Sequence, residues 1–217
     1  MSEHMTEEEQ VEALKKWWRD NGTAIIIGIV VGLAVVIGVR YWFSYKETRA
    51  LHASDAYNNF TAAIAKKDKA LSQKLAAEML DKYKGTSYAA LTAMWLAKQD
   101  VTANKLPEAA KHLRWAVDHP GYKTISLIAR DRLARVLVAE NKLDEALKVL
   151  DAVKDQTFEP RFAMVKGDIL SKQGKTVQAR EAYQLALTDP TLAGKERNLV
   201  QMKMDNLSSS LSQDSKK

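Results

Sequence analysis

The clearest pattern along the chain is an uncharged and strongly apolar run close to the N-terminus. Residues 21–39 contain no charged side chain, and Thr23–Val39 consists almost entirely of isoleucine, valine, leucine, glycine and alanine. As a helix rising about 1.5 Å per residue, this run reaches about 28 Å, close to the thickness of the hydrocarbon core of a bilayer. The pattern therefore predicts one membrane-spanning helix, with residues 21–43 as the anchor.

Both ends of the run carry the residues expected at the surface of a membrane. Lys15–Arg19 places two tryptophans between cations, and Arg40–Phe43 joins an arginine to three aromatic rings. Cations beside aromatic rings suit the headgroup layer, and a buried helix of a soluble domain has no reason to carry them. A cleaved signal peptide would have a shorter apolar region and would end at a small-x-small cleavage site. We therefore interpret the run as an uncleaved anchor.

Small residues recur at intervals of four within the anchor. Gly28 and Gly32, with Ala24 one turn earlier, form a shallow groove on one helix face that another helix can approach closely. Glycine is also common in membrane helices in general. Two interpretations stay open: either Gly28 and Gly32 pack against a specific partner helix, or they have no specific partner.

Residues 1–20, before the anchor, are expected to form a short cytoplasmic tail. If residues 10–18 are helical, Val11, Leu14 and Trp18 share one face, which suits contact with the membrane surface. The alternative is a disordered tail with an aromatic anchor, because residues 1–9 are polar and acidic and offer little to bury.

Beyond Phe43 the sequence favours packed helices without strand-like alternation. Three helix-turn-helix units show the same spacing of small and apolar residues. Their equivalent small residues are Ala109, Ala146 and Ala179. The spacing is close to the period of about 34 residues that is typical of tetratricopeptide repeats, in which small residues let two antiparallel helices touch. The chain is therefore predicted to be all-α: a single N-terminal transmembrane helix followed by a tetratricopeptide-like helical-hairpin solenoid.

Two further elements complete the predicted solenoid, which spans residues 44–207. Residues 47–84 are expected to form a fourth, degenerate hairpin. After Pro190, a capping helix is expected to cover the last repeat, with four apolar residues turned towards it: Leu192, Leu199, Met202 and Leu207. Residues 208–217 are expected to be a disordered tail.

Charge and composition narrow the functional classes. The whole chain carries a net charge of +6; residues 1–43 hold four cations and six acids, so the remainder carries +8. The cations of that remainder alternate with acids instead of forming one basic stripe, which argues against nucleic-acid binding. The chain has no cysteine, which excludes disulfides and thiolate metal sites. Cations are equally numerous on the two sides of the anchor, so charge alone does not orient it.

The histidines and glycines form no catalytic motif. His4, His52, His112 and His119 make no His-Glu-x-x-His pair, and the chain lacks a Gly-x-Ser-x-Gly elbow, a Gly-x-Gly-x-x-Gly turn and a Walker loop. We therefore expect a non-enzymatic protein that requires no cofactor and no metal.

Repeat helices instead build a concave surface that can bind extended or helical peptides. The register of the first helix in each unit turns six side chains towards that surface: Met94, Lys98, Asp131, Arg135, Met164 and Asp168. Methionine offers an adaptable apolar contact, and the charged groups can hold a peptide backbone or its ends. The alternative is that both methionines pack between helices while the charged groups face water.

Several short motifs also resemble one known family. They are Gln10-Val11-Glu12-Ala13, Asn21-Gly22, Arg40-Tyr41-Trp42, Arg132-Leu133-Ala134-Arg135-Val136 and Met202-Lys203-Met204-Asp205-Asn206-Leu207. Their order along nearly the whole chain resembles the YfgM-type family, the ancillary subunit of the bacterial SecYEG translocon. The resemblance implies a bacterial inner-membrane protein with a cytoplasmic N-terminus and a periplasmic repeat domain. It further implies contacts with the SecYEG channel, with a PpiD-type periplasmic chaperone and with translocated polypeptides.

Two functional hypotheses follow. In the first, the chain is a membrane-tethered chaperone adaptor: its repeats bind a periplasmic chaperone or newly translocated polypeptides, and the anchor keeps them near the channel. In the second, the chain is a regulatory binder whose acidic tail, from Glu3 to Glu12, sequesters a soluble cytoplasmic regulator. The two differ in which side of the membrane carries the activity.

Overall fold

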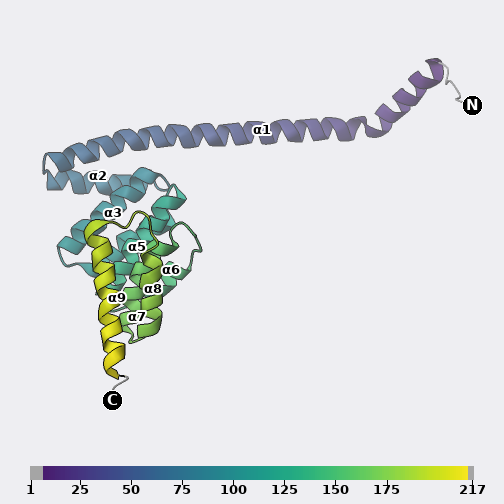
Figure 1. Ribbon diagram of the computed structural model, residues 1–217. Coiled ribbons are helices and arrows are strands. Elements are labelled where there is room, and N and C mark those ends of the chain that lie inside the picture. The colour runs from purple at the N-terminus through teal and green to yellow at the C-terminus, as the bar shows by residue number, and fades with distance from the viewer. Residues whose placement is uncertain (1–6, 215–217) are drawn as a thin grey trace, which may run out of the picture. The chain divides into compact units, whose positions relative to one another are not determined.

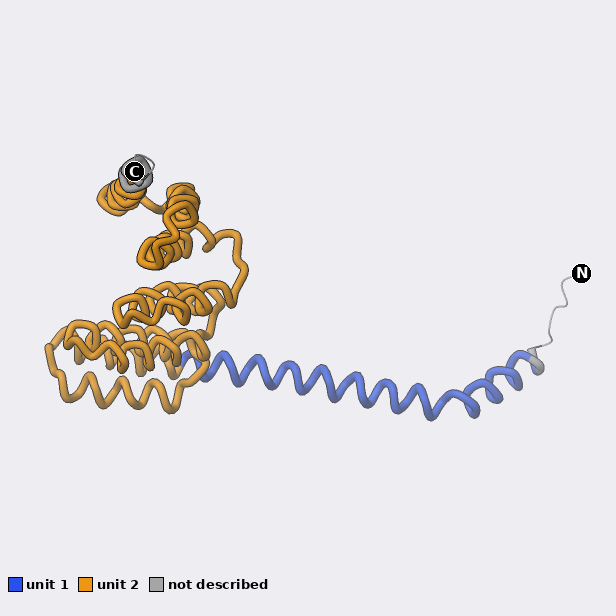
Figure 2. Tube along the Cα trace, turned by 90° about the horizontal axis from the view of Figure 1, so that it is seen from below, with its two compact units in different colours: residues 1–51 blue, residues 52–217 orange. Residues whose placement is uncertain are grey.

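The computed structural model of the protein describes residues 7–214. Within this range the chain forms nine α-helices and no strand (Figure 1): α1 (Glu7–Ala65), α2 (Lys69–Lys82), α3 (Ser87–Thr102), α4 (Leu106–Asp118), α5 (Lys123–Ala139), α6 (Leu143–Asp151), α7 (Glu159–Lys172), α8 (Thr176–Ala186) and α9 (Gly194–Asp214). The predicted all-α class is confirmed. The chain separates into two compact units, Met1–Leu51 and His52–Lys217 (Figure 2).

α1 is one helix of 59 residues, not a separate tail and anchor. The boundaries expected after residues 20 and 43 therefore fall inside it. The segment contains no proline, and extending an existing helix gains a hydrogen bond for each residue that is fixed. Of the two interpretations of residues 10–18, the helical one is therefore confirmed.

The apolar stretch of α1 is almost entirely uncovered. Ile29, Val36 and Ile37 all have more than half of their surface exposed. In the described part of the chain, α1 is the one helix long and apolar enough to cross a membrane. Apolar surface of this extent is unfavourable in water and favourable in hydrocarbon. α1 is therefore the candidate membrane anchor.

α1 is bent between its first turns and its long remainder (Figure 1). Two contacts between residues 17 and 22 are of the kind that bends helices. The side-chain amide of Asn21 donates a hydrogen bond to the carbonyl oxygen of Trp17 at 3.0 Å, and so competes with the backbone for that carbonyl. The indole of Trp18 lies against Gly22, where a Cβ would come within 3.1 Å of the ring. A side chain that enters the hydrogen-bond ladder and a glycine beside it are common causes of helix bends.

In the second unit, successive helices form hairpins: the end of α1 with α2, α3 with α4, α5 with α6, and α7 with α8 (Figure 1). Each hairpin turns through one residue with positive φ, namely Lys67, Asn104, Asn141 and Gly174. At all four turns the next backbone N–H donates to a carbonyl five residues earlier, as in Lys105 to Asp100 at 2.8 Å. This is the Schellman arrangement that ends a helix. The shared turn identifies four equivalent hairpins, including the degenerate one expected within residues 47–84.

Small side chains occupy the places where the helices of a hairpin meet. Ala109, Ala146 and Ala179 are fully buried, as the repeat pattern predicts. In the last hairpin Gly167 makes the close contact between α7 and α8, because a Cβ there would lie 2.5 Å from the ring of Tyr183. A buried apolar cluster extends from α3 to α7, and a smaller one joins α7, α8 and α9.

α9 packs against α8 and covers the open end of the last hairpin, as expected of a solenoid cap. Leu192 and Leu207 pack against the smaller cluster as predicted. Leu199 and Met202 are 43% and 53% exposed and do not pack against this cluster. Val200, which is fully buried, packs there in their place. The inward face of α9 follows residues 200, 204 and 207, so two of the four residues were predicted on the wrong face.

α9 also extends further than expected. Residues 208–217 were predicted to be disordered, but the helix continues to Asp214. Adding residues to a formed helix costs little even when the sequence is polar, because each one gains a backbone hydrogen bond. Residues 215–217 lie outside the described range.

Candidate binding surface of the repeat domain

A hollow of about 220 Å³ lies across α5, α7 and the start of α9. We call it the α5–α7–α9 hollow. Its lining combines apolar side chains with two arginines and two carboxylates: Arg135, Pro160, Arg161, Met164, Ala186, Asp189, Thr191, Leu192 and Glu196. Such a lining can receive a peptide segment that presents both charged and apolar side chains.

Two of the predicted binding residues, Arg135 and Met164, meet in this hollow. A third predicted residue, Asp131, forms an ion pair with Arg135. Nε and Nη2 of Arg135 donate to the two carboxylate oxygens of Asp131 at 2.9 and 3.3 Å, and the Asp131 side chain is buried. Two parallel charge-assisted bonds fix the plane of a guanidinium group. Asp131 therefore positions Arg135 and does not itself line the hollow.

Asp168 lies apart from the α5–α7–α9 hollow and connects three helices. Its Oδ1 accepts hydrogen bonds from the Tyr183 hydroxyl at 2.7 Å and from Lys203 Nζ at 2.6 Å. Burial, together with the hydrogen bond to Asp168, raises the pKa of Tyr183 well above its usual value, so the phenol stays protonated and keeps donating. Because Tyr183 belongs to α8 and Lys203 to α9, Asp168 ties both helices to α7. It lines a second hollow beside this contact.

The two predicted residues on α3 lie apart from the hollow. Met94 is only 4% exposed and belongs to the large core cluster, with Nη1 of Arg132 at 3.7 Å from its sulfur atom. Of the two interpretations given for Met94, the structure therefore agrees with packing between helices, because the next hairpin covers this side chain. Lys98 is exposed but does not line the α5–α7–α9 hollow.

Seven of the nine lining residues were not among the predicted binding residues, and Arg161, Leu192 and Glu196 are three of them. Arg161 precedes Met164 by one turn on the same helix face, so its spacing could have identified it. Within residues 7–214 its side chain makes no ion pair, and its charge is available to a ligand. Leu192 and Glu196 come from the turn after the last repeat and from α9. No repeat pattern covers those positions.

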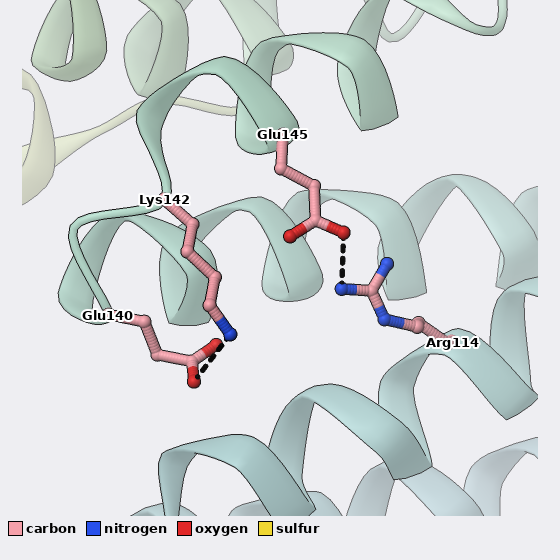
Figure 3. Close-up of polar contacts among 4 residues, drawn as sticks. All are labelled: Arg114, Glu140, Lys142 and Glu145. Carbon is pink, nitrogen blue, oxygen red and sulfur yellow. Dashed lines mark hydrogen bonds and ion pairs between the residues drawn. The ribbon is translucent and has the colours of Figure 1, made fainter.

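Other ion pairs of the repeat domain join neighbouring elements instead of forming a site. Nη2 of Arg114 on α4 lies 2.6 Å from Oε1 of Glu145 on α6, and Lys142 contacts Glu140 at 3.1 Å across the α5–α6 turn (Figure 3). The exposed pair of Arg114 and Glu145 contributes about 0–1 kcal/mol. The first pair joins two successive hairpins, and the second joins two residues of a single turn.

A half-buried lysine links the second and third predicted units. Burial opposes the charge of Lys166, but hydrogen bonds to Asp151 and Glu159, at 2.9 and 3.0 Å, outweigh it and raise the pKa of Lys166. Asp151 ends α6 and Glu159 begins α7. Lys166 therefore stabilises the connection on which the position of Arg161 depends.

In the anchor, the face that carries Gly28 and Gly32 is open. A Cβ at either glycine would meet no other atom within 4 Å. This leaves room for a second helix, but both earlier interpretations of the pattern are compatible with an open face. A role in helix packing stays a prediction.

Two other expectations concern chemistry and the N-terminal tail. In the described part of the chain, no group of three or more histidine, aspartate or glutamate residues is placed to hold a metal ion. The acidic tail of the regulatory hypothesis begins at Glu3, and residues 1–6 lie outside the described range. Sequestration of a regulator by that tail stays a prediction.

Comparison with known proteins extends over the anchor as well as the repeats. The tetratricopeptide repeat-like domain family matches residues 15–209. The ancillary SecYEG translocon subunit of Escherichia coli (strain K12) is 34% identical over 212 residues, which cover 96% of this chain and 100% of the relative. The subunits of Haemophilus influenzae and Neisseria gonorrhoeae are each 26% identical, over 95% of this chain and 100% of each relative. No solved structure matches the chain.

These matches agree with the helical-repeat architecture. The relatives are matched along their whole length, and the matches cover 95–96% of this chain. Both the repeat-like domain and the ancillary subunits are non-catalytic kinds of protein. The chain belongs to the YfgM-type family of ancillary SecYEG translocon subunits.

Proposed function

We propose that this protein is a non-enzymatic ancillary subunit of the SecYEG translocon, held in the bacterial inner membrane by a single span. Its N-terminus lies in the cytoplasm and its repeat domain in the periplasm. There the repeat domain binds a PpiD-type periplasmic chaperone, newly translocated polypeptides, or both. The observation that carries the proposal is the match to the Escherichia coli subunit over 96% of the chain, anchor included.

The lining of the α5–α7–α9 hollow supports a role in binding peptides. Met164 and Leu192 supply apolar contacts, and methionine adapts its shape to different partners. Arg161 supplies a guanidinium group that can pair with a carboxylate of a bound segment, whereas the guanidinium group of Arg135 is already paired with Asp131. A surface of this kind accommodates segments of varied sequence, which is what a subunit beside the channel meets.

The anchor supports the same role by confining that surface. A binding site tethered near the channel exit meets an emerging chain at a much higher effective concentration than a freely diffusing site does. Weak contacts in the hollow then suffice for frequent capture. Contact between the anchor and a helix of the translocon would fix the tether in place, and the open face at Gly28 and Gly32 is suited to it.

Replacing Gly28 and Gly32 together with leucine is expected to lower the amount of SecYEG that co-purifies with the full-length chain from gently solubilised membranes. Leucine fills the shallow groove and keeps a partner helix at a distance, and recovery falls about tenfold for each 1.4 kcal/mol of packing that is lost. The control is Val30→Leu, which adds a leucine on the opposite face of the same helix. Unchanged recovery with the double variant, or an equal loss with the control, contradicts contact through this face.

A further inference from the structure

The first turns of α1, before the apolar stretch, present an apolar face that no residue between 7 and 214 covers. Val11, Leu14 and Trp18 are 50%, 64% and 54% exposed. Their spacing of three and four residues places them along one side of the helix. Large apolar groups aligned in this way are unfavourable in water and usually mark a contact surface.

A second stripe of the same segment is cationic. Lys15, Lys16 and Arg19, with Glu12 and Ala13, line a shallow hollow along the helix. Within residues 7–214 none of the three cations makes an ion pair. They precede Thr23, where the apolar stretch begins, by four to eight residues, or about 6–12 Å along a helix. If that stretch spans a membrane, this distance places the three charges at the depth of the lipid headgroups.

The bend in α1 separates this segment from the axis of the anchor (Figure 1). The hydrogen bond from Asn21 to the Trp17 carbonyl and the contact of Trp18 with Gly22 involve residues 17–22, directly before the apolar stretch that begins at Thr23. A straight helix would carry both stripes directly away from the membrane. A bent one can turn its apolar stripe towards the surface and leave the cations among the headgroups.

We propose that residues 10–20 form an amphipathic helix that lies on the membrane surface and recognises anionic phospholipid headgroups through Lys15, Lys16 and Arg19. Val11, Leu14 and Trp18 enter the boundary between headgroups and acyl chains. The acidic positions 7–9 are about 21 Å or more from the apolar stretch. The three cations are therefore closer along the helix to the apolar stretch than these acidic positions are.

At the C-terminal end of the anchor, two cations contact aromatic side chains of the same helix. Nζ of Lys46 lies over the ring of Trp42 at 5.1 Å, and Nη1 of Arg49 contacts the Tyr45 hydroxyl at 3.5 Å. These groups are engaged by aromatic side chains of their own helix. This flank also carries three cations, Arg40, Lys46 and Arg49, and so it provides a charge-matched control.

The experiment uses the full-length chain in lipid nanodiscs. Because the chain has no cysteine, single cysteines at positions 11, 13, 14 and 31 can each carry a spin label. Accessibility of the label to oxygen, which concentrates in lipid, is compared with its accessibility to a water-soluble nickel complex. The nanodiscs contain either phosphatidylcholine alone or phosphatidylcholine with phosphatidylglycerol.

With phosphatidylglycerol present, labels at positions 11 and 14 are expected to favour oxygen and the label at position 13 to favour nickel. The variant Lys15→Gln with Lys16→Gln and Arg19→Gln is expected to lower the ratio of surface-bound to free segment on the order of 100-fold, because each cation near an anionic surface contributes about 1 kcal/mol. The variant Arg40→Gln with Lys46→Gln and Arg49→Gln is expected to leave that ratio unchanged.

Three results overturn the proposal: nickel access at positions 11 and 14 in both lipids, the same accessibility with and without phosphatidylglycerol, or an equal loss in the two triple variants. The label at position 31 serves as the internal reference. Oxygen access there shows that the anchor is inserted, so a failure of the surface helix is distinguished from a failure of the membrane span.

Discussion

Replacing Phe60 with alanine is expected to lower the free energy of unfolding of the repeat domain by about 3–5 kcal/mol. Phe60 lies near the end of α1 and is 1% exposed. Its ring meets that of Trp95 on α3 edge to face, with centroids 5.1 Å apart. Truncation loses this contact and leaves a cavity that rigid helices fill poorly. The expected loss is large because the end of α1 is a structural part of the first hairpin.

The measurement is urea unfolding of the full-length chain in nanodiscs, followed by the fluorescence of the tryptophans in the repeat domain. Asn59→Ala is the control, because Asn59 is the exposed neighbour of Phe60 and its truncation is expected to change stability by no more than about 0.5 kcal/mol. Equal stability of the two variants would show that the end of α1 does not belong to the repeat domain.

Replacing Gly167 with valine is expected to lower the free energy of unfolding by about 3 kcal/mol, because the added side chain overpacks the contact between α7 and α8. A Cβ at this position would lie 2.5 Å from Cε1 and 2.6 Å from Cδ1 of Tyr183. The ring cannot withdraw easily, because Tyr183 is buried and its hydroxyl donates to Asp168. Either α7 and α8 separate, or the bond that ties α8 to Asp168 breaks.

The same unfolding measurement tests this expectation, with two further variants. Ser171→Val, one turn later on α7, introduces the same side chain without the contact, and we expect it to cost less than about 1 kcal/mol. Tyr183→Ala combined with Gly167→Val removes the opposing ring, so the double variant is expected to lose less than the sum of the single losses, by about 1 kcal/mol or more. Additive losses would mean that Gly167 and Tyr183 do not constrain each other.

Much of the fold could be predicted because its determinants are local. The turn residues Asn104, Asn141 and Gly174 belong to types that adopt positive φ most readily, and they recur at nearly constant spacing. The alanines at helix contacts recur with the same period. The first hairpin looked degenerate because Lys67 occupies its turn, and lysine carries no such signal even though it adopts the same conformation.

The site was harder to predict because it depends on contacts between distant segments. Register identified the helix face that carries Arg135 and Met164, but not that the next hairpin covers Met94. The pair formed by Asp168 and Lys203 joins residues 35 positions apart, and it exists only because α9 docks with Val200 inward. The spacing of apolar residues on α9 was compatible with burial of either of two neighbouring helix faces. Packing against α8 determines which of the two is buried.

The most direct test of the proposed function is photo-crosslinking in cells from the α5–α7–α9 hollow. A photoreactive amino acid replaces Arg161 or Met164, both of which line the hollow, and in the control it replaces Val177, which is exposed on α8 and does not line it. Adducts are identified by mass spectrometry in membranes of known orientation. We predict adducts with newly translocated polypeptides or a periplasmic chaperone from positions 161 and 164, and few from position 177. Adducts with cytoplasmic proteins alone, or equal adducts from all three positions, would contradict a periplasmic binding surface at the translocon.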